Sequence, residues 1–94
     1  MSYRIVAFHY PKPQFRDELL QRLVSAAEII KAAPGCIDVE VWKEQARHAL
    51  VSTAKFDSRD SCMSALRTTA QATDIQFDER EERAREIYDL VEPG

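Results

Sequence analysis

Apolar side chains recur along the chain with two different periods, and each period predicts a different kind of element. Residues 3–10, YRIVAFHY, are rich in β-branched and aromatic side chains and predict a strand. Residues 13–33 carry apolar side chains at three- and four-residue spacing with charged residues mostly opposite, which predicts an amphipathic helix. Pro13 fits the first turn of this helix, and Pro34-Gly35 ends it.

The stretch CIDVEVWKEQ, at residues 36–45, predicts a second strand with two unlike faces. Ile37, Val39 and Val41 make one face apolar. The intervening positions give the other face two carboxylates and an indole: Asp38, Glu40 and Trp42.

A third strand and a shorter helix follow. Residues 46–49 lack the signature of a tight hairpin turn and predict a loose loop before the strand at 50–56, LVSTAKF. Asp57-Ser58 is suited to cap a helix. The apolar side of that helix is marked by Cys62, Leu66 and Thr69 or Ala70.

The end of the chain allows two interpretations. Residues 71–82 are mixed and polar, with a turn of helix expected near residues 74–77. The segment REIYDLVE, at 85–92, alternates in a way that favours a strand, and we predict a strand there. The alternative is a charged helix, because Glu79/Arg83 and Glu81/Arg85 stand four residues apart.

The predicted order is strand, helix, strand, strand, helix, strand, which is typical of a single ferredoxin-like α+β domain over residues 1–94. This split βαβ topology gives a four-stranded antiparallel sheet of order 4-1-3-2, with both helices on one face. The second strand then lies at an edge, where Asp38 and Glu40 discourage pairing with other chains.

The two central strands are apolar on both faces, although two helices cover only one face. We assign one set of side chains to the helix-facing side, as core or pocket residues: Val6, Phe8, Tyr10, Ser52, Ala54, Phe56 and, on the last strand, Tyr88. The opposite face then carries Ile5, Ala7, His9 and Val51.

An uncovered apolar sheet face is unusual on a monomer, and the simplest cover is a second copy of the chain. We therefore predict a homodimer, the dimeric α+β barrel, with Ile5, Ala7 and Val51 in the interface and Trp42 as an anchor. The alternative is that Ala7, Thr53 and Lys55 leave this face wet enough for a monomer.

Composition narrows the choice of partners. The 94 residues carry a net charge of −3 without a basic stripe, which argues against nucleic acid as a partner. No apolar run is long enough to span a bilayer, and the first residues lack a signal-peptide pattern. Cys36 and Cys62 are then expected to be reduced thiols of a cytoplasmic protein. The run DEREERARE, at 78–86, is interpreted as a solvated surface.

Two segments, AAPGCIDVEVWKE and ALVSTAKFDSRDSCMSAL, resemble the antibiotic-biosynthesis monooxygenase-like domains of the dimeric α+β barrel superfamily. The resemblance rests on two features: the turn at Pro34-Gly35, and the sequence Phe56-Asp57-Ser58, which opens the second helix. The family implies a homodimer with a pocket between sheet and helices in each subunit. Some members oxidise polycyclic aromatic or quinol substrates with molecular oxygen and without a metal or flavin.

The resemblance therefore implies a monooxygenase that needs no cofactor and acts on a hydrophobic or aromatic small molecule of the quinol or anthrone type.

The chain departs from the family in three places. The aromatic residue that is usually Trp is Phe56 here, the residue nearest an Asn used by haem-degrading relatives is Val6, and no histidine follows His48. Haem degradation is therefore not expected, and the oxygenase interpretation is weakened.

Few residues are suited to chemistry. Cofactor-free oxygenation needs a base, and His9 is the first candidate, with a structural or interface role as the alternative. His48 is interpreted as a solvated turn residue. Two histidines and two cysteines, none at ligand spacing, predict no metal site. Two other functions stay open: a non-enzymatic dimeric barrel that binds a small ligand or serves in assembly, and an isomerase that uses one base without oxygen.

Overall fold

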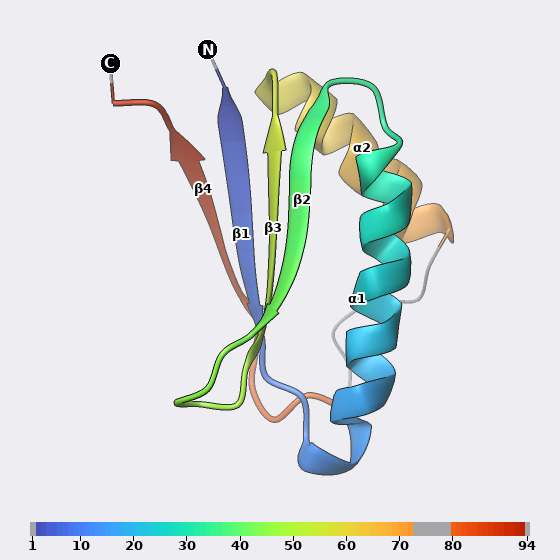
Figure 1. Cartoon of the computed structure of the whole chain (residues 1–94), viewed down its shortest axis with the longest axis vertical. Helices are drawn as coiled ribbons and strands as arrows, with labels where there is room; N and C mark the ends of the chain where they lie inside the picture. Colours follow the sequence, from blue (N-terminus) through green and yellow to red (C-terminus); the bar gives the residue numbers. More distant parts are fainter. Residues whose placement is uncertain (1, 73–79, 94) are drawn as a thin grey trace.

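The computed structural model describes residues 2–72 and 80–93 (Figure 1). A single turn of 3-10 helix at Pro13–Phe15 leads directly into the first α-helix. The elements in chain order are β1 (Tyr3–His9), α1 (Arg16–Lys31), β2 (Cys36–Lys43), β3 (Leu50–Phe56), α2 (Arg59–Ala72) and β4 (Glu86–Val91).

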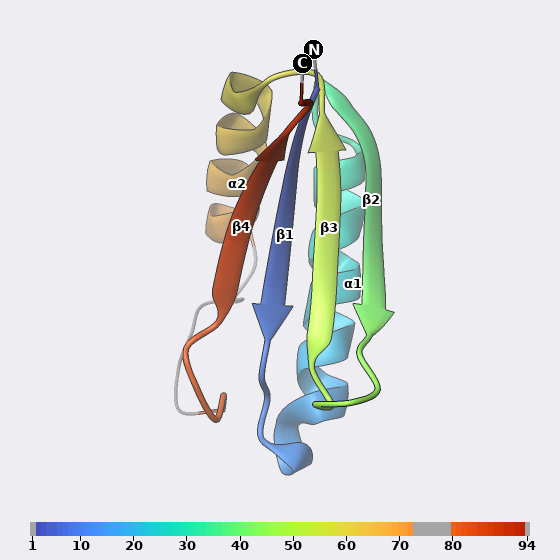
Figure 2. The same ribbon diagram turned by 90° about the vertical axis from the view of Figure 1, so that its left-hand side faces the viewer.

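The four strands form one antiparallel sheet in the order β2-β3-β1-β4. Both helices lie on the same face of this sheet, and the other face is open (Figures 1 and 2). The predicted ferredoxin-like topology and strand order are therefore confirmed. The segment before the C-terminus is a strand rather than a helix, as we predicted.

Short polar sequences fix the ends of the helices. Gly35 adopts a left-handed backbone with φ of +84°, and its carbonyl accepts a hydrogen bond from the Asp57 amide at 2.9 Å. This bond ties the end of α1 to the start of α2. The Ser58 hydroxyl accepts a hydrogen bond from the Ser61 amide at 3.1 Å, which confirms the predicted cap.

The buried core lies between the sheet and the helices. Its main cluster joins β1 and β3 to α2 and consists of Tyr3, Ala54, Phe56, Cys62 and Ala65. Helix α1 contributes two further buried side chains, Leu23 and Ala26.

The faces of β1 are the reverse of those we predicted. Ile5 pairs with Ala54 and Ala7 pairs with Ser52, and directly paired residues project to the same side of a sheet. Ile5, Ala7 and His9 therefore face the helices. The expectation that they face outward is wrong.

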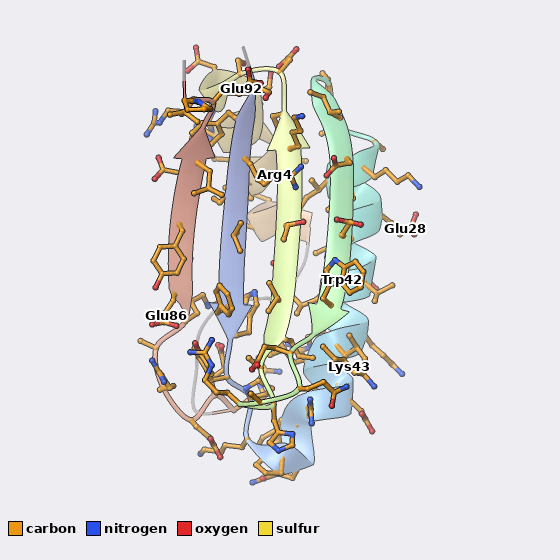
Figure 3. All side chains as sticks on the ribbon, turned by 60° about the vertical axis from the view of Figure 1, so that its left-hand side comes forward. Arg4, Glu28, Trp42, Lys43, Glu86 and Glu92 are labelled. Atoms are coloured by element: carbon orange, nitrogen blue, oxygen red, sulfur yellow. The ribbon has the colours of Figure 1, made fainter. Side chains whose placement is uncertain are left out.

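Val6 and Phe8 lie on the open face. Arg4 shares their parity, and its guanidinium forms an ion pair with Asp38 at 3.3 Å on that face (Figure 3). Burying the Arg4 side of β1 under the helices would desolvate this charge, which explains the orientation.

The edge strand β2 has the two unlike faces that its sequence predicts. Val39 and Val41 face the helices, whereas Asp38, Glu40 and Trp42 lie on the open face. A register shift between Cys36 and Asp38 interrupts the ladder, and Ile37, which lies at this irregularity, is 57% exposed. The expectation that Ile37 shares one face with Val39 and Val41 is therefore wrong.

Tyr88 also lies on the open face, because its partner across the ladder is Val6. Its ring meets the Phe8 ring edge-on, with the ring centroids 6.2 Å apart. The prediction that Tyr88 faces the helix side is wrong.

Four remaining expectations have different outcomes. Residues 46–49 form a loop in which His48 has a positive φ of 57°. Cys36 and Cys62 form no disulfide. The turn of helix expected near residues 74–77 lies outside the described residues. None of the helices that the structure describes is long and apolar enough to cross a membrane.

Candidate functional site

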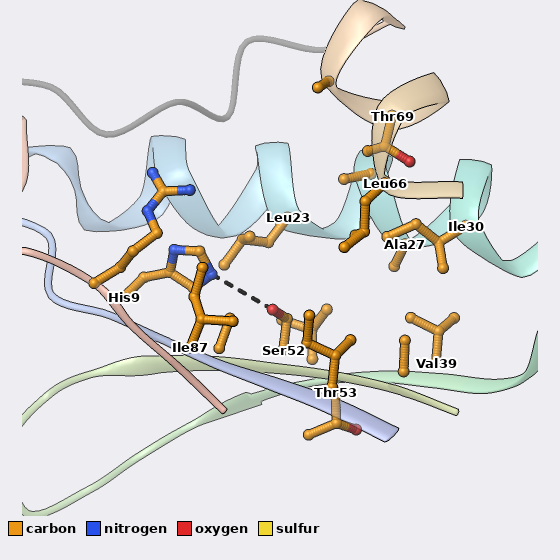
Figure 4. Close-up of a pocket in the computed structure, with 17 residues that line it drawn as sticks. His9, Leu23, Ala27, Ile30, Val39, Ser52, Thr53, Leu66, Thr69 and Ile87 are labelled. Carbon is orange, nitrogen blue, oxygen red and sulfur yellow. Dashed lines mark hydrogen bonds between the residues drawn. The ribbon is translucent and has the colours of Figure 1, made fainter. Parts of the chain in front are cut away.

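A cavity of about 210 Å³ lies between the sheet and the two helices (Figure 4). All four strands border it, together with α1 and α2. Its walls are mainly aliphatic and include Leu23, Ala27, Ile30, Val39, Leu66 and Ile87. The elements that form the cavity are those that bury the core, and their small residues leave the space unfilled.

His9 is the main titratable side chain in the cavity wall. It stands at the end of β1 and is only 3% exposed. Its Nε2 atom lies 3.4 Å from the hydroxyl of Ser52 on β3 (Figure 4). Burial, and then the nearby positive charge of Arg85, lower the pKa of His9 from 6.5 to about 4. The imidazole is therefore neutral near pH 7 and able to accept a proton.

A buried ion pair lies behind this histidine. The Arg85 guanidinium donates a hydrogen bond to Oε2 of Glu81 at 2.9 Å, and the Glu81 side chain is almost completely enclosed. The other carboxylate oxygen, Oε1, lies 3.9 Å from Nδ1 of His9. Arg85 also borders the cavity. One end of a mainly apolar cavity thus holds an imidazole, a hydroxyl and a paired guanidinium.

The backbone holds Glu81 against the end of β1. Glu81 forms a β-bridge with Pro11. The Lys12 amide donates to the Arg80 carbonyl at 2.8 Å, and the Glu82 amide donates to the Tyr10 carbonyl at 2.7 Å. The segment before β4 is therefore fixed to the residues that follow His9.

Of the seven residues assigned to the helix-facing side as core or pocket residues, Ser52 and Ala54 border the cavity. Phe56 is fully buried in the core cluster beneath α2. Tyr10 is buried beyond the end of β1, where its hydroxyl donates to Glu86 and the Arg83 guanidinium lies 4.2 Å from its ring centroid. The other three, Val6, Phe8 and Tyr88, lie on the open face described above.

The four residues predicted for the dimer interface divide between the two faces. Ile5 and Ala7 border the cavity, so they are unavailable for a contact on the open face. Trp42 is 58% exposed and pairs across the ladder with Val51, and both lie on the open face. This face therefore remains suited to an interface, with a partly different set of residues.

Glu81 and Arg85 are the residues of the candidate site that we did not predict from the sequence. Their four-residue spacing indicated an ion pair, and that pair forms, although the segment is not helical. The interpretation of the whole charged run as solvated is wrong for Glu81, which is 6% exposed. Apart from that spacing, the run has no clear period, so it indicated no direction for any of its side chains.

The thiols are poorly suited to nucleophilic catalysis. Burial raises the pKa of both Cys36 and Cys62, which favours the unreactive thiol form. Within residues 2–72 and 80–93, no group of three His, Cys, Asp or Glu side chains is placed to hold a metal ion.

The sheet, the helices and the cavity define a small α+β domain of the ferredoxin-like class with a mainly apolar site between the sheet and the helices. Residues 2–76 match the antibiotic biosynthesis monooxygenase family, and the chain belongs to this family. The resemblance predicted from the sequence is thereby confirmed. No curated protein matches the chain in sequence.

Solved structures of similar fold come from several organisms. A conserved protein from Methanosarcina mazei Go1 is 22% identical, with a TM-score of 0.84 over 96% of this chain and 91% of that one. Rv0793 from Mycobacterium tuberculosis is 16% identical, with a TM-score of 0.81 over 100% and 97%. A variant of SnoaB, a cofactor-independent oxygenase from Streptomyces nogalater, is 14% identical, with a TM-score of 0.76 over 99% and 94%. At these identities the likeness establishes the fold.

Proposed function

We propose that the protein is a cofactor-independent monooxygenase that binds a hydrophobic aromatic molecule of the quinol or anthrone type in the helix-side cavity. His9 is the base in this proposal. The observation that carries it is a buried, neutral imidazole at one end of an apolar cavity, with Nε2 beside Ser52 and Nδ1 facing the Glu81 carboxylate. Membership of the monooxygenase family supports the class of reaction.

The size and lining of the cavity support a ring-shaped ligand. Its volume of about 210 Å³ exceeds the roughly 150 Å³ of an apolar cavity that admits benzene. Aliphatic walls favour flat hydrocarbon surface over charged or sugar-like groups. A hydroxyl or carbonyl of the ligand would then meet the polar end, where His9 and Ser52 lie.

The reaction needs electrons from the substrate alone. His9 removes a proton from a methylene carbon between aromatic rings, and the resulting carbanion reduces molecular oxygen as a carbon–oxygen bond forms. The peroxide takes the proton back from the imidazolium. Loss of the second methylene proton together with hydroxide then leaves a carbonyl and one water. Each CH₂ thus consumes one O₂ and yields one C=O and one H₂O.

Ser52, His9 and Glu81 also resemble an array for acyl transfer, but the sheet argues against that use. Ser52 lies in a central strand, paired with Ala7 on one side and Val41 on the other. Its neighbouring backbone N–H groups belong to the ladders, so in the described chain nothing beside Ser52 resembles an oxyanion hole. Proton transfer by His9 therefore fits the site better.

Oxygen consumption with anthrone and substituted hydroquinones tests the proposed reaction. We expect product to form with the native chain in air and not under argon, with a loss of roughly 10²-fold or more in kcat for His9→Gln. His48→Gln is the matched control, because His48 is exposed in a loop. Oxygen-dependent turnover that survives His9→Gln would remove His9 from the mechanism, and no turnover across the panel would overturn the oxygenase proposal.

The low pKa of His9 favours a second candidate, a domain that binds an aromatic ligand without transforming it. An imidazole with a pKa of about 4 is a weak base in the empty cavity. Isothermal titration with the same compounds distinguishes the two functions. Binding without oxygen uptake supports the second candidate, whereas binding coupled to oxygen uptake supports the first.

We also propose that the protein is a homodimer joined through the open sheet face. Trp42, Tyr88 and Leu90 are each about half exposed there, at 58%, 49% and 49%. Phe8 and Val51 extend this apolar area across the central strands.

The free thiols of Cys36 and Cys62 support a reducing compartment, and we propose the cytoplasm.

A further inference from the structure

Two buried polar atoms face each other behind the cavity without a hydrogen bond. Nδ1 of His9 and Oε1 of Glu81 are both shielded from solvent, and neither has a hydrogen-bonding partner among the described residues. They lie 3.9 Å apart. Buried polar atoms are normally paired, so this arrangement indicates a bond that a small movement would close.

The two oxygens of Glu81 have different surroundings. Oε2 accepts a hydrogen bond from Arg85 at 2.9 Å, which fixes the plane of the carboxylate. Oε1 is left pointing toward the imidazole. A carboxylate oxygen only accepts hydrogen bonds, so the imidazole must supply the proton on Nδ1. When a neutral histidine carries its proton on Nδ1, Nε2 keeps a free lone pair. Nε2 of His9 can then accept a hydrogen bond from the Ser52 hydroxyl or from a ligand.

We propose that Glu81 is the positioning residue of this site: it holds the proton of His9 on Nδ1, turns the Nε2 lone pair toward the cavity, and carries the countercharge when His9 accepts a proton. The inference deepens the proposed function and rests on it for the catalytic role. The tautomer of His9 is independent of any reaction, so this part of the inference is testable by itself.

Burial, and after it the positive charge of Arg85, keeps the histidine neutral in the site. Arg85 also forms an ion pair with the Glu81 carboxylate at 2.9 Å, so two opposite charges lie close together behind the imidazole. Apart from His9 and Arg85, the residues that line the cavity are uncharged; they include Ser52 from β3 and Leu23 from α1 (Figure 4). The charge balance at Nδ1 is therefore set by Glu81 and Arg85.

Nitrogen-15 NMR of the histidine-labelled protein at pH 7 measures the tautomer directly. We expect the two ring nitrogens of His9 to show widely separated signals, with the proton on Nδ1. His48→Asn assigns the second set of signals, and the exposed Glu82→Gln is the matched carboxylate control. In Glu81→Leu we expect a shift toward the Nε2-protonated form. A native His9 with its proton on Nε2 would overturn the inference without any variant.

A charge cycle tests the countercharge. Arg85→Met removes the opposing cation, so Glu81 should raise the pKa of His9 from about 4 to above its ordinary value of 6.5. The double variant Glu81→Gln/Arg85→Met removes both charges, and the pKa should return below 6.5. An equal rise in the single and double variants would show that Glu81 carries no countercharge. Arg85→Lys keeps the cation and should leave the pKa low.

Turnover separates this inference from the proposed function. If oxygenation occurs, Glu81→Gln should lower kcat by roughly 10²-fold with little change in KM. The reason is that ligand binding depends on apolar contacts, whereas proton transfer by His9 depends on the Glu81 charge. If no substrate is turned over while the tautomer and the charge cycle behave as expected, the oxygenase proposal fails and the positioning role of Glu81 stands. Unchanged kcat in Glu81→Gln, in an active enzyme, would overturn the catalytic role.

Discussion

His9 is neutral in the folded chain because burial and Arg85 oppose its charge, and this affects stability as well as chemistry. In the unfolded chain the same side chain has its ordinary pKa of 6.5, against about 4 when folded. Between these values the unfolded chain binds more protons than the folded one. The stability that neutral His9 contributes is therefore fully present above pH 6.5 and declines as the pH falls toward 4.

We expect the native chain to lose about 2 kcal/mol of unfolding free energy between pH 7.5 and pH 5 from His9 alone. Urea denaturation at a series of pH values measures this loss. His9→Gln cannot titrate, so its stability should stay nearly flat over the same interval, whatever its absolute value. A native profile that is equally flat would contradict the buried, neutral state of His9.

A second pH interval belongs to carboxylates and serves as an internal control. Hydrogen bonds lower the pKa of Glu44, Glu86 and Glu92 below 4.5, mainly through the Arg47 amide, the Tyr10 hydroxyl and the Ser2 hydroxyl, respectively. Their contribution is present above pH 4.5 and is lost as the pH falls below it. Both the native chain and His9→Gln should therefore lose stability there.

The sequence predicted part of the site at this scale. His9 stood out because its ordinary pKa lies near neutrality, and Ser52 because the alternation of β3 was assigned to the correct face. Glu81 was hidden because a run of nine mainly charged residues has no period from which to infer a buried member. Its burial depends on the pairing of Glu81 with Pro11, a contact between segments distant in sequence.

At the scale of elements, the sequence predicted which segments are strands more reliably than which way each strand faces. Alternation defines the faces of β2 because carboxylates occupy one of them. In β1 both sets are apolar, and the single discriminating residue is Arg4, which requires the open face. Tyr88 and Ile87 posed the same ambiguity in β4, and the register with β1 decides it.

The junction between α1 and α2 gives a prediction for Gly35. Its φ of +84° is unfavourable for other residues, and an added Cβ would lie 2.6 Å from both Asp57 Oδ1 and Ser61 Oγ. We expect Gly35→Ala to destabilise the fold by about 2 kcal/mol or more, measured by urea denaturation.

His48 provides the matched comparison, since it also has a positive φ but lies in an exposed loop. There the relief of backbone strain in His48→Gly roughly offsets the entropic cost of glycine, so stability should change by less than about 1 kcal/mol. If Gly35→Ala and His48→Gly lost similar amounts of stability, the close contacts of Gly35 with the start of α2 would contribute nothing to the cost of Gly35→Ala.

The whole molecule is a two-layer structure with one covered and one open sheet face (Figure 2). Topology followed from the order of elements, because few arrangements satisfy right-handed crossovers with two helices. The partner of the open face does not follow from topology. Charged pairs such as Arg4 and Asp38 share that face with apolar side chains, so it suits a specific interface better than a random hydrophobic contact.

Trp42 tests that interface, because it is the largest exposed apolar side chain on the face (Figure 3) and shares the open face of β2 with Asp38 and Glu40. If the open faces meet, Trp42→Glu buries an additional charge at an acidic edge, and the dimer dissociation constant should rise roughly 30-fold or more, corresponding to about 2 kcal/mol. Sedimentation velocity over a micromolar concentration series measures this constant.

Val24→Glu, on the exposed side of α1, is the control and should leave the dimer intact. A native monomer at all concentrations contradicts the assembly itself, whereas a dimer that tolerates Trp42→Glu but not Val24→Glu moves the interface to the helical layer.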